Sequence, residues 1–333
     1  MSQREKGVRA VRKLVAFLIV GLLGLSALVA FFLRRQPDGL LQPGEFPELR
    51  GAYLGQHPPR GLPERFAPGI VCSNYPDTVP VFSPDGTEVY WSRFLGKGRG
   101  HIMVSRVENG RWSYPEPVSF SQPGAMDGQP TLSGDGLTML FVSRRPADGK
   151  VPEPMLFSLW TTRRNQGRWA APRPLGASIN TGAEDFSCLA SDGTLFFSSW
   201  RPTGSGKRAA NVYRSESVGG AYGQPEMLPP PINATDGTLV SHVAPDQSYM
   251  ILDSRRAGGL GETDLYLSFR QNDGSWGTPN NMGPTINTPA FEHFASLSPD
   301  RRYFFFGSDR DGNMDAYWVE AKIIDDLKAN STR

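Results

Sequence analysis

A four-residue turn recurs five times along the chain, and this repetition constrains the fold more than any other feature of the sequence. The copies span residues 83–86, 133–136, 190–193, 244–247 and 298–301, with aspartate always in the third position. Successive aspartates are separated by 50, 57, 54 and 54 residues. Aspartate accepts hydrogen bonds from the nearby backbone and glycine tolerates positive φ, so each copy is predicted to reverse the chain between two strands.

Three further segments follow each of the first four turns, and two follow the last. An apolar, aromatic-rich segment follows each turn directly and ends near a serine and an arginine, as in residues 139–143, 249–254 and 304–308. A second apolar segment comes next, at residues 102–105, 159–162, 212–215, 265–268 and 316–319. The last segment begins with an aromatic residue and has a proline three positions later; the aromatic residues are Trp112, Trp169, Tyr222 and Trp276. Such segments are typical of strands. Together with the strand that precedes the turn, they predict a four-stranded antiparallel unit in each repeat.

The order of these segments predicts how the repeats close into a ring. Phe66 and Pro68 resemble a first copy of the aromatic segment, yet they precede the first turn. The chain stops soon after the third strand of the fifth repeat, so residues 66–71 can supply its missing strand. We therefore predict an all-β domain at residues 65–320, a five-bladed β-propeller closed by an N-terminal strand, with six blades as the alternative.

Residues 14–33 form an uncharged stretch of twenty residues. At about 1.5 Å per residue, a helix of this length crosses the roughly 30 Å core of a bilayer. The alternative is a cleavable signal peptide, whose apolar region is shorter and ends at small residues, whereas this one ends in bulky residues before Arg34 and Arg35. The sequence therefore predicts a single-pass anchor.

Charge around this span predicts its orientation. Five basic residues and one acidic residue precede it, which places residues 1–13 in the cytoplasm and the propeller in the periplasm or outside the cell. The remaining residues are close to neutral and lack the basic surface that nucleic acid binding needs, so we exclude a nucleic acid partner.

The residues on either side of the propeller predict a stalk before it and a helix after it. Residues 34–64 are rich in proline and glycine and predict a stalk between the membrane and the propeller. Residues 321–333 predict a short helix and tail, because Ile323, Ile324 and Leu327 follow helical spacing. Cys72 and Cys188 are the only cysteines and are predicted to be buried thiols.

Several of these motifs carry a family resemblance. The five turns, the segment 258–266 (GGLGETDLY), and residues 276–279 leading to Ile286, Asn287 and Thr288 resemble the TolB-like propeller repeat, a relative of the WD-repeat propellers. The resemblance covers about residues 65–320. It implies a propeller fold, and families with this repeat include periplasmic partner-binding proteins and the propeller portions of some peptidases. TolB itself resembles a six-bladed propeller with a preceding α/β domain, whereas this chain has five repeats.

The candidate ligand-binding residues are mostly acidic and recur with the repeat. Eight positions before the turn aspartates lie Asp77, Asp127, Glu184, Thr238 and Glu292. If this position begins the innermost strand, the carboxylates converge at one mouth of the central channel and could bind a ligand. Asp127, Glu184 and Glu292 are also the candidates for a glycosidase pair, which needs a separation of roughly 5–9.5 Å. The structural alternative is that each carboxylate caps its own blade.

Other polar residues provide weaker candidates. His242 and His293 fall in adjacent repeats and are further ligand-binding candidates, but no close spacing supports a metal site. Asp309, Asp311, Asn313 and Asp315 alternate like a calcium loop, although the completing bidentate glutamate is missing and turn chemistry explains the pattern as well. No metal or cofactor is therefore predicted.

Two further residue types recur with the repeat. Arginines end the second strand of every repeat, and they predict ion pairs with acidic residues of neighbouring blades, or alternatively a ring for anions; they are Arg93, Arg145, Arg201, Arg256 and Arg310. The recurring tryptophans predict packing between blades.

The sequence favours binding over catalysis. It contains no Gly-x-Ser-x-Gly elbow, phosphate-binding loop or His-Glu-x-x-His motif. We predict a membrane-tethered module that binds a protein or a cell-envelope glycan. The alternative is a carbohydrate-active hydrolase or lyase that uses the carboxylates at the channel mouth.

Overall fold

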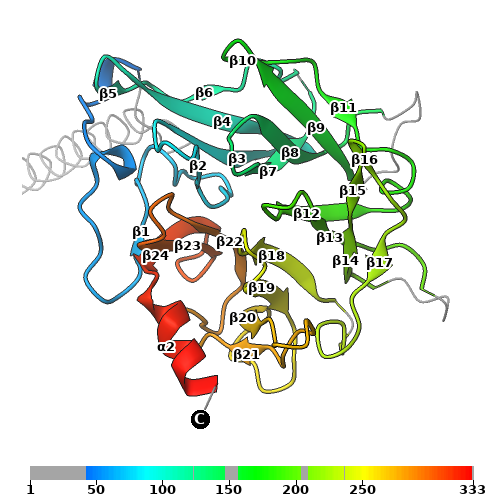
Figure 1. Ribbon diagram of the computed structural model, residues 1–333. Helices are drawn as coiled ribbons and strands as arrows, with labels where there is room; N and C mark the ends of the chain where they lie inside the picture. Colours follow the sequence, from blue (N-terminus) through cyan, green and yellow to red (C-terminus); the bar gives the residue numbers. More distant parts are fainter. Residues whose placement is uncertain (1–42, 123, 147–156, 204–208, 236, 332–333) are drawn as a thin grey trace, which may run out of the picture.

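The computed structural model describes residues 43–122, 124–146, 157–203, 209–235 and 237–331, which form five antiparallel sheets around a common centre (Figure 1). The predicted five-bladed propeller is therefore confirmed. The predicted anchor at residues 14–33 and the tail at residues 1–13 lie outside the described residues. Within the described ranges, no helix is both long enough and apolar enough to span a bilayer.

Each blade follows the order expected from the repeat, with the first strand nearest the ring centre. Blade 1 contains β2 (Val81–Phe82), β3 (Glu88–Gly96), β4 (Arg99–Glu108), β5 (Arg111–Trp112) and β6 (Glu116–Pro117). Blade 2 contains β7 (Asp127–Leu132), β8 (Thr138–Ser143), β9 (Ser158–Asn165), β10 (Arg168–Trp169) and β11 (Arg173–Pro174). Blade 3 contains β12 (Glu184–Leu189), β13 (Leu195–Ser199), β14 (Asn211–Ser215) and β17 (Glu226–Met227), with a projecting hairpin, β15 (Ser217–Val218) and β16 (Ala221–Tyr222).

The last two blades have four strands each. Blade 4 contains β18 (Leu239–Val243), β19 (Tyr249–Ser254), β20 (Asp264–Phe269) and β21 (Asn280–Asn281). Blade 5 contains β22 (Glu292–Leu297), β23 (Tyr303–Ser308), β24 (Asp315–Glu320) and, from the other end of the sequence, β1 (Glu64–Arg65).

The recurring turns have a common geometry. In the first copy, Oδ1 of Asp85 accepts hydrogen bonds from Oγ of Ser83 (2.6 Å) and from the backbone N of Thr87 (3.0 Å). Gly86 adopts a positive φ of 70°. In the last two copies Gln247 and Arg301 replace glycine, yet their φ values are 58° and 57°. The aspartate therefore holds the same turn even where the fourth residue has a side chain.

Five hydrophobic clusters fill the interfaces between consecutive blades, one for each interface. Trp169 packs with residues of blade 1, and Trp276 packs with residues of blade 3. Trp112 lies in the cluster that joins blades 5 and 1. The prediction that the recurring tryptophans pack between blades is confirmed. Cys72 and Cys188 are free, buried thiols, as predicted.

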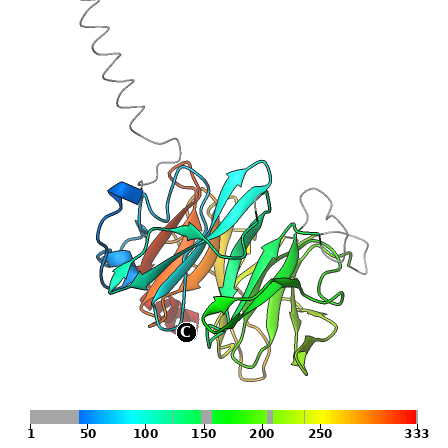
Figure 2. The same ribbon diagram turned by 90° about the horizontal axis from the view of Figure 1, so that it is seen from above.

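The N-terminal strand closes the ring, at a position slightly different from the predicted one. β1 pairs antiparallel with β24, and N of Phe66 donates to O of Ala316 at 2.8 Å. The strand that pairs with β24 therefore ends just before residues 66–71, which were predicted to form it. The reason is a tight turn in which N of Val71 donates to O of Ala67, so this segment cannot remain extended. Figure 2 shows the first described residues beside the last blade.

The segment predicted as a stalk packs on this closure over its described part, which includes two short 3₁₀ turns, η1 (Pro43–Glu45) and η2 (Tyr53–Gly55). Nε1 of Trp112 donates to O of Gly51 at 2.8 Å, and the hydroxyl of Tyr53 donates to Asp300 at 2.7 Å. Leu54 is buried in the adjoining cluster. The predicted C-terminal helix is present as α2 (Lys322–Ser331), with Ile324 buried.

Candidate functional site: the central channel

The recurrent carboxylates are bound within their own blades. In blade 2, Asp127 accepts hydrogen bonds from Oγ of Ser143 (2.7 Å) and from Nε and Nη2 of Arg145 (3.0 and 2.5 Å). The same guanidinium donates to O of Phe120 at 2.9 Å, in the segment that enters the blade. Each such cluster thus joins the first strand, the second strand and the connection from the preceding blade; we call it the carboxylate–arginine cluster.

Blades 1, 3 and 5 repeat this arrangement. The ion pairs are Asp77–Arg93 (2.9 Å), Glu184–Arg201 (3.6 Å) and Glu292–Arg310 (3.3 Å). The prediction that the arginines pair with acids of neighbouring blades is therefore wrong. The register explains the difference. In blades 2, 3 and 5 the carboxylate begins the first strand directly opposite the serine that precedes the arginine by two residues, and in blade 1 Asp77 lies directly opposite Arg93.

Blade 4 departs from the pattern in the way the sequence indicates. Thr238 replaces the carboxylate and its hydroxyl lies 3.2 Å from Oγ of Ser254. Arg256 donates to the carbonyls of Pro231 and Ile232, while its Nε has no partner among the described residues.

These clusters leave the carboxylates no accessible surface. Asp77, Asp127, Glu184 and Glu292 are all 0% exposed. Burial raises the pKa of Asp77 to about 6 and also raises the pKa of Glu184, against the opposing effect of the arginines and hydrogen-bond donors. The geometry is that of the structural alternative, in which each carboxylate caps its own blade.

The residues that resemble a calcium loop are engaged by protein donors. Arg65 lies 3.2 Å from Asp311 and 3.1 Å from Asp315, so a guanidinium occupies the place between the two carboxylates. Nδ2 of Asn313 donates to backbone carbonyls, and Oδ1 of Asp309 accepts from N of Phe291 at 2.8 Å. Across the described part of the chain, no three His, Cys, Asp or Glu side chains are grouped to hold a metal.

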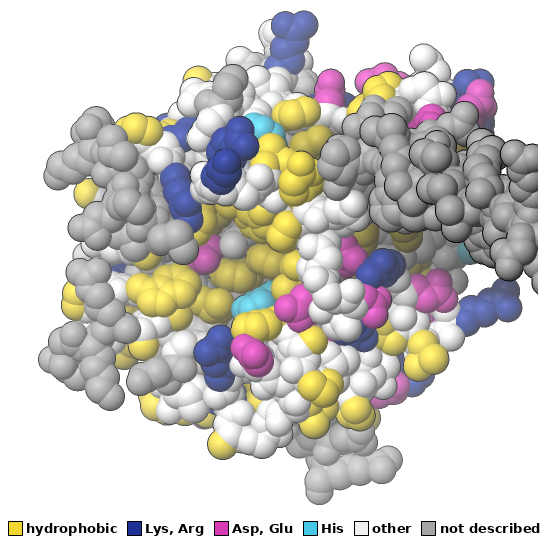
Figure 3. All heavy atoms as spheres, turned by 180° about the vertical axis from the view of Figure 1, so that it is seen from behind, with side chains coloured by type: hydrophobic (Ala, Val, Ile, Leu, Met, Phe, Trp, Pro, Cys, Tyr) yellow, Lys and Arg dark blue, Asp and Glu magenta, His cyan; other side chains and the backbone are white. Residues whose placement is uncertain are grey.

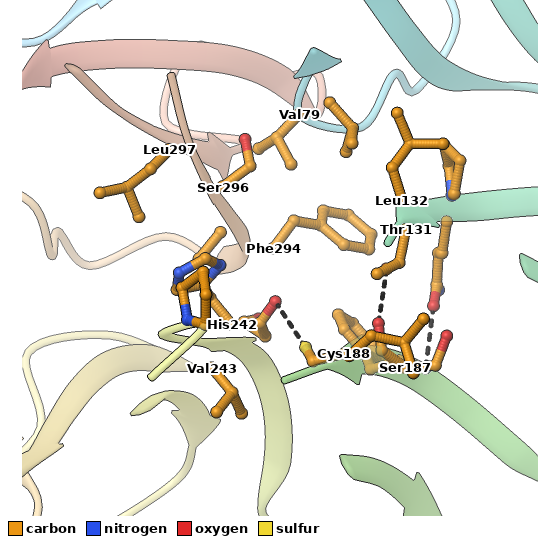
Figure 4. Close-up of a pocket in the computed structure, with 18 of the residues that line it drawn as sticks. Val79, Thr131, Leu132, Ser187, Cys188, His242, Val243, Phe294, Ser296 and Leu297 are labelled. Carbon is orange, nitrogen blue, oxygen red and sulfur yellow. Dashed lines mark hydrogen bonds between the residues drawn. The ribbon is translucent and has the colours of Figure 1, made fainter. Parts of the chain in front are cut away.

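The centre of the ring is a small hollow lined by both apolar and polar side chains. A cavity of about 180 Å³ is lined by residues from the inner strands of all five blades (Figure 4). Each inner strand ends in an apolar residue that lines it: Phe82, Leu132, Leu189, Val243 and Leu297. Viewed from behind, the centre of the molecule is hollowed and lined by hydrophobic side chains (Figure 3). The sequence carries a signal for this ring that our prediction missed, because an apolar residue lies three positions before every turn aspartate.

Strained backbone shapes the middle of the channel. Gln129, Phe186 and Phe294 adopt φ values of 51°, 43° and 58°, each at a bulge in its inner strand. Such bulges redirect side chains, and left-handed non-glycine residues persist only where the surroundings hold them. Phe186 and Phe294 stack with ring centroids 5.2 Å apart. The stack brings side chains from blades 3 and 5 together across the channel.

Next to this stack lies a cluster of titratable groups. Buried Asp253 is 3.0 Å from Nδ1 of His293, and it accepts hydrogen bonds from N of Phe294 (3.3 Å) and from Oγ of Ser241. Asp185 interacts electrostatically with both His293 and Asp253, and burial raises its pKa to about 7. Acids with a raised pKa often lie at functional sites, so Asp185 joins the candidates although the sequence analysis did not select it.

The two predicted histidines have different environments. His242 lines the central cavity, and its ring lies 6.0 Å from that of Tyr249. Burial lowers the pKa of His242 to about 4, so it is neutral at pH 7. His293 pairs with Asp253 and is partly exposed. The structure therefore places His242 in the wall of the cavity and His293 beside Asp253 and Phe294, and the described residues do not group the two histidines with a third metal ligand.

Replacing Asp185 with asparagine is expected to flatten the pH dependence of stability. A carboxyl whose pKa is raised from 3.8 to about 7 holds its proton more tightly in the folded chain, so the stability it confers falls as pH rises between these values. In the variant, the decline of stability that Asp185 causes should be absent, and the smaller decline that Asp77 causes should remain. Melting temperatures from pH 4 to pH 8 measure both, with Asp192→Asn in an exposed turn as control. Parallel curves for the parent and Asp185→Asn would contradict the assignment.

Some solved structures resemble this chain, whereas family models and curated proteins do not match it. A scan against protein-family models and a search of curated proteins found no match. Among solved structures, TolB from Acinetobacter baumannii matches with a TM-score of 0.48 and 16% identity, over 75% of this chain and 55% of that one. The chain is similar in structure to TolB. TolB from Agrobacterium tumefaciens gives a TM-score of 0.46 and 16% identity, over 72% of each chain.

Enzymes are also among the similar structures. A gluconolactonase from Xanthomonas campestris matches with a TM-score of 0.43 and 12% identity, over 85% of this chain and 97% of that one. This TM-score and those for the two TolB structures are below 0.5, so the propeller assignment rests on the strand pairing described above. This chain spans little more than half the length of the A. baumannii TolB.

Proposed function

We propose that this chain is a binding module held at the cytoplasmic membrane by residues 14–33, with its propeller in the periplasm or outside the cell. Its partner is a protein that inserts an apolar side chain into the central channel. The observation that carries this proposal is the central cavity at which all five inner strands end, each in an apolar residue. TolB-like propellers favour a protein as the partner.

The size and lining of the cavity set the kind of group it takes. An apolar cavity of roughly 150 Å³ in another protein binds benzene, so about 180 Å³ suits one aromatic or branched aliphatic side chain. Leu132, Leu189 and Leu297 are partly exposed at the ends of their strands and would contact such a group. Burying one side chain of this size contributes about 1.5–3 kcal/mol, which makes it a suitable anchor for a larger interface.

The rival function, glycoside cleavage, has less support. It needs two carboxyl groups that reach the sugar, whereas Asp127, Glu184 and Glu292 are fully buried and bound to arginine or serine in their own blades. These groups are better placed to stabilise the blades than to act as acid and base. The proposed binding function requires no cofactor.

A selection experiment tests the proposal. The full chain in nanodiscs is used to select peptides from a displayed random library, and fluorescence polarisation then gives their affinities. Leu297→Asp and Leu132→Asp should each weaken binding more than tenfold, because a charge at the cavity mouth opposes burial of an apolar group. Leu260→Asp, at an exposed leucine in a loop of blade 4, serves as the matched control.

Two results would overturn the proposed function. In one, the selected peptides bind Leu297→Asp as tightly as the parent chain, which would place their site outside the channel. In the other, the purified chain cleaves members of a polysaccharide panel and selects no peptide, which would favour the hydrolase.

A further inference from the structure

A second hollow lies at the outer edge of the ring, between blades 2 and 3. It has a volume of about 720 Å³, within the range of roughly 300–1,000 Å³ that is typical of ligand sites. Its walls come from β9, from the connection between β10 and β11, and from the β15–β16 hairpin that projects from blade 3 beside them (Figure 1). We call it the outer groove.

Comparison of the repeats shows that the charges of this groove are specific to blade 2. In blade 1, Arg106 pairs with Glu88 across β3 and β4 and with Glu116 on β6. In blade 3, Arg214 pairs with Glu226 on β17 at 2.9 Å. The outermost strand of each of these blades therefore supplies a glutamate that neutralises an arginine.

Blade 2 has different residues at the same places. Thr138 lies opposite Arg163, as Glu88 lies opposite Arg106 in blade 1. Arg173 stands four residues after Trp169, where blade 1 has Glu116 four residues after Trp112. Blade 2 has thus exchanged two acidic positions for a threonine and a second arginine.

This exchange leaves two arginines without acidic partners. Arg163 and Arg173 are exposed, line the groove and form no ion pair with any residue that the structure describes. No aspartate or glutamate lines the groove; Asp135, in the preceding turn, interacts with Arg163 electrostatically without forming an ion pair. Two unneutralised guanidinium groups in one hollow favour an anionic ligand, since each can form paired hydrogen bonds to a carboxylate.

The rest of the wall favours a sugar over a peptide. Thr138, Ser217 and Tyr222, which carry hydroxyl groups, are among the residues that line the groove. Ala170, Ala171, Gly176 and Gly220 also line the groove, and such small residues leave room for a ligand. We propose that the outer groove binds an acidic oligosaccharide, with Arg163 and Arg173 on its carboxylates and the wall hydroxyls on its hydroxyl groups.

Binding of a defined oligosaccharide tests this site. The full chain in nanodiscs of zwitterionic lipid is titrated calorimetrically with hexagalacturonate, with the neutral maltohexaose and with hexaglutamate. Hexagalacturonate should bind at least tenfold more tightly than either comparison ligand, and less tightly as salt is raised. Arg173→Glu, which gives blade 2 the glutamate of blades 1 and 3, should weaken its binding at least tenfold.

Matched variants separate the site from general charge effects. Arg163→Gln should also weaken binding, whereas Arg168→Gln, at an exposed arginine on β10 that does not line the groove, should change it less than twofold. An unchanged melting temperature for Arg173→Glu excludes unfolding as the cause. Equal binding of the acidic and neutral hexamers, tighter binding of hexaglutamate, or full affinity in Arg173→Glu would overturn the proposal. None of these results depends on the peptide site in the channel.

Discussion

Replacing Arg145 with alanine is expected to lower the free energy of unfolding by about 3–5 kcal/mol. Arg145 is buried against Asp127, which is 0% exposed, and it also donates to O of Phe120. Its guanidinium lies near the rings of Phe120, Phe141 and Trp160 as well. Removing it leaves a buried carboxylate without its cation and separates blade 2 from the connection to blade 1. Urea unfolding followed by tryptophan fluorescence measures the change.

The matched control is Arg214→Ala, which breaks the Arg214–Glu226 ion pair, whose glutamate is largely exposed. Such pairs contribute about 0–1 kcal/mol, so the two variants should differ severalfold. The double variant Asp127→Ala with Arg145→Ala should lose less stability than the two single variants lose together, because neither buried charge is then left without its partner. A loss below 1 kcal/mol in Arg145→Ala would show that these clusters do not stabilise the blades.

Replacing Phe66 with alanine is expected to lower the free energy of unfolding by about 3–5 kcal/mol, because it opens a cavity where the ring closes. Phe66 is 0% exposed, and its ring centroid lies 5.0 Å from that of Phe305 and 5.2 Å from that of Trp318. It also contacts Phe82 of blade 1, so the change weakens both sides of the closure. Differential scanning calorimetry of the full chain measures the effect.

Leu62→Ala provides the control for this change, because Leu62 is 71% exposed and lies just before β1. It should shift stability by less than about 0.5 kcal/mol. Hydrogen exchange adds a local measurement, since the amides of β24 that pair with β1 should exchange faster in Phe66→Ala than in the parent chain. If both variants melt like the parent, the N-terminal strand is not needed to close the ring.

The sequence by itself determined the repeat and the order of strands within each blade, and it favoured five blades over six. These features depend on interactions within a few residues, such as the Asp85 side chain with Ser83 and Thr87, and on the alternation of turns and apolar segments. The same local signals indicated that an N-terminal segment completes blade 5 and that residues after 321 form a helix.

Only the tertiary structure decided which side chains meet. The register of adjacent strands places Arg145 next to Asp127 of its own blade. Residues of the predicted stalk pack against the strands that close the ring. The central cavity and the outer groove join residues from different blades, such as Leu132 with Leu297 and Arg163 with Tyr222. Contacts of this kind depend on how whole blades stack around the axis, which local turn and strand preferences do not specify.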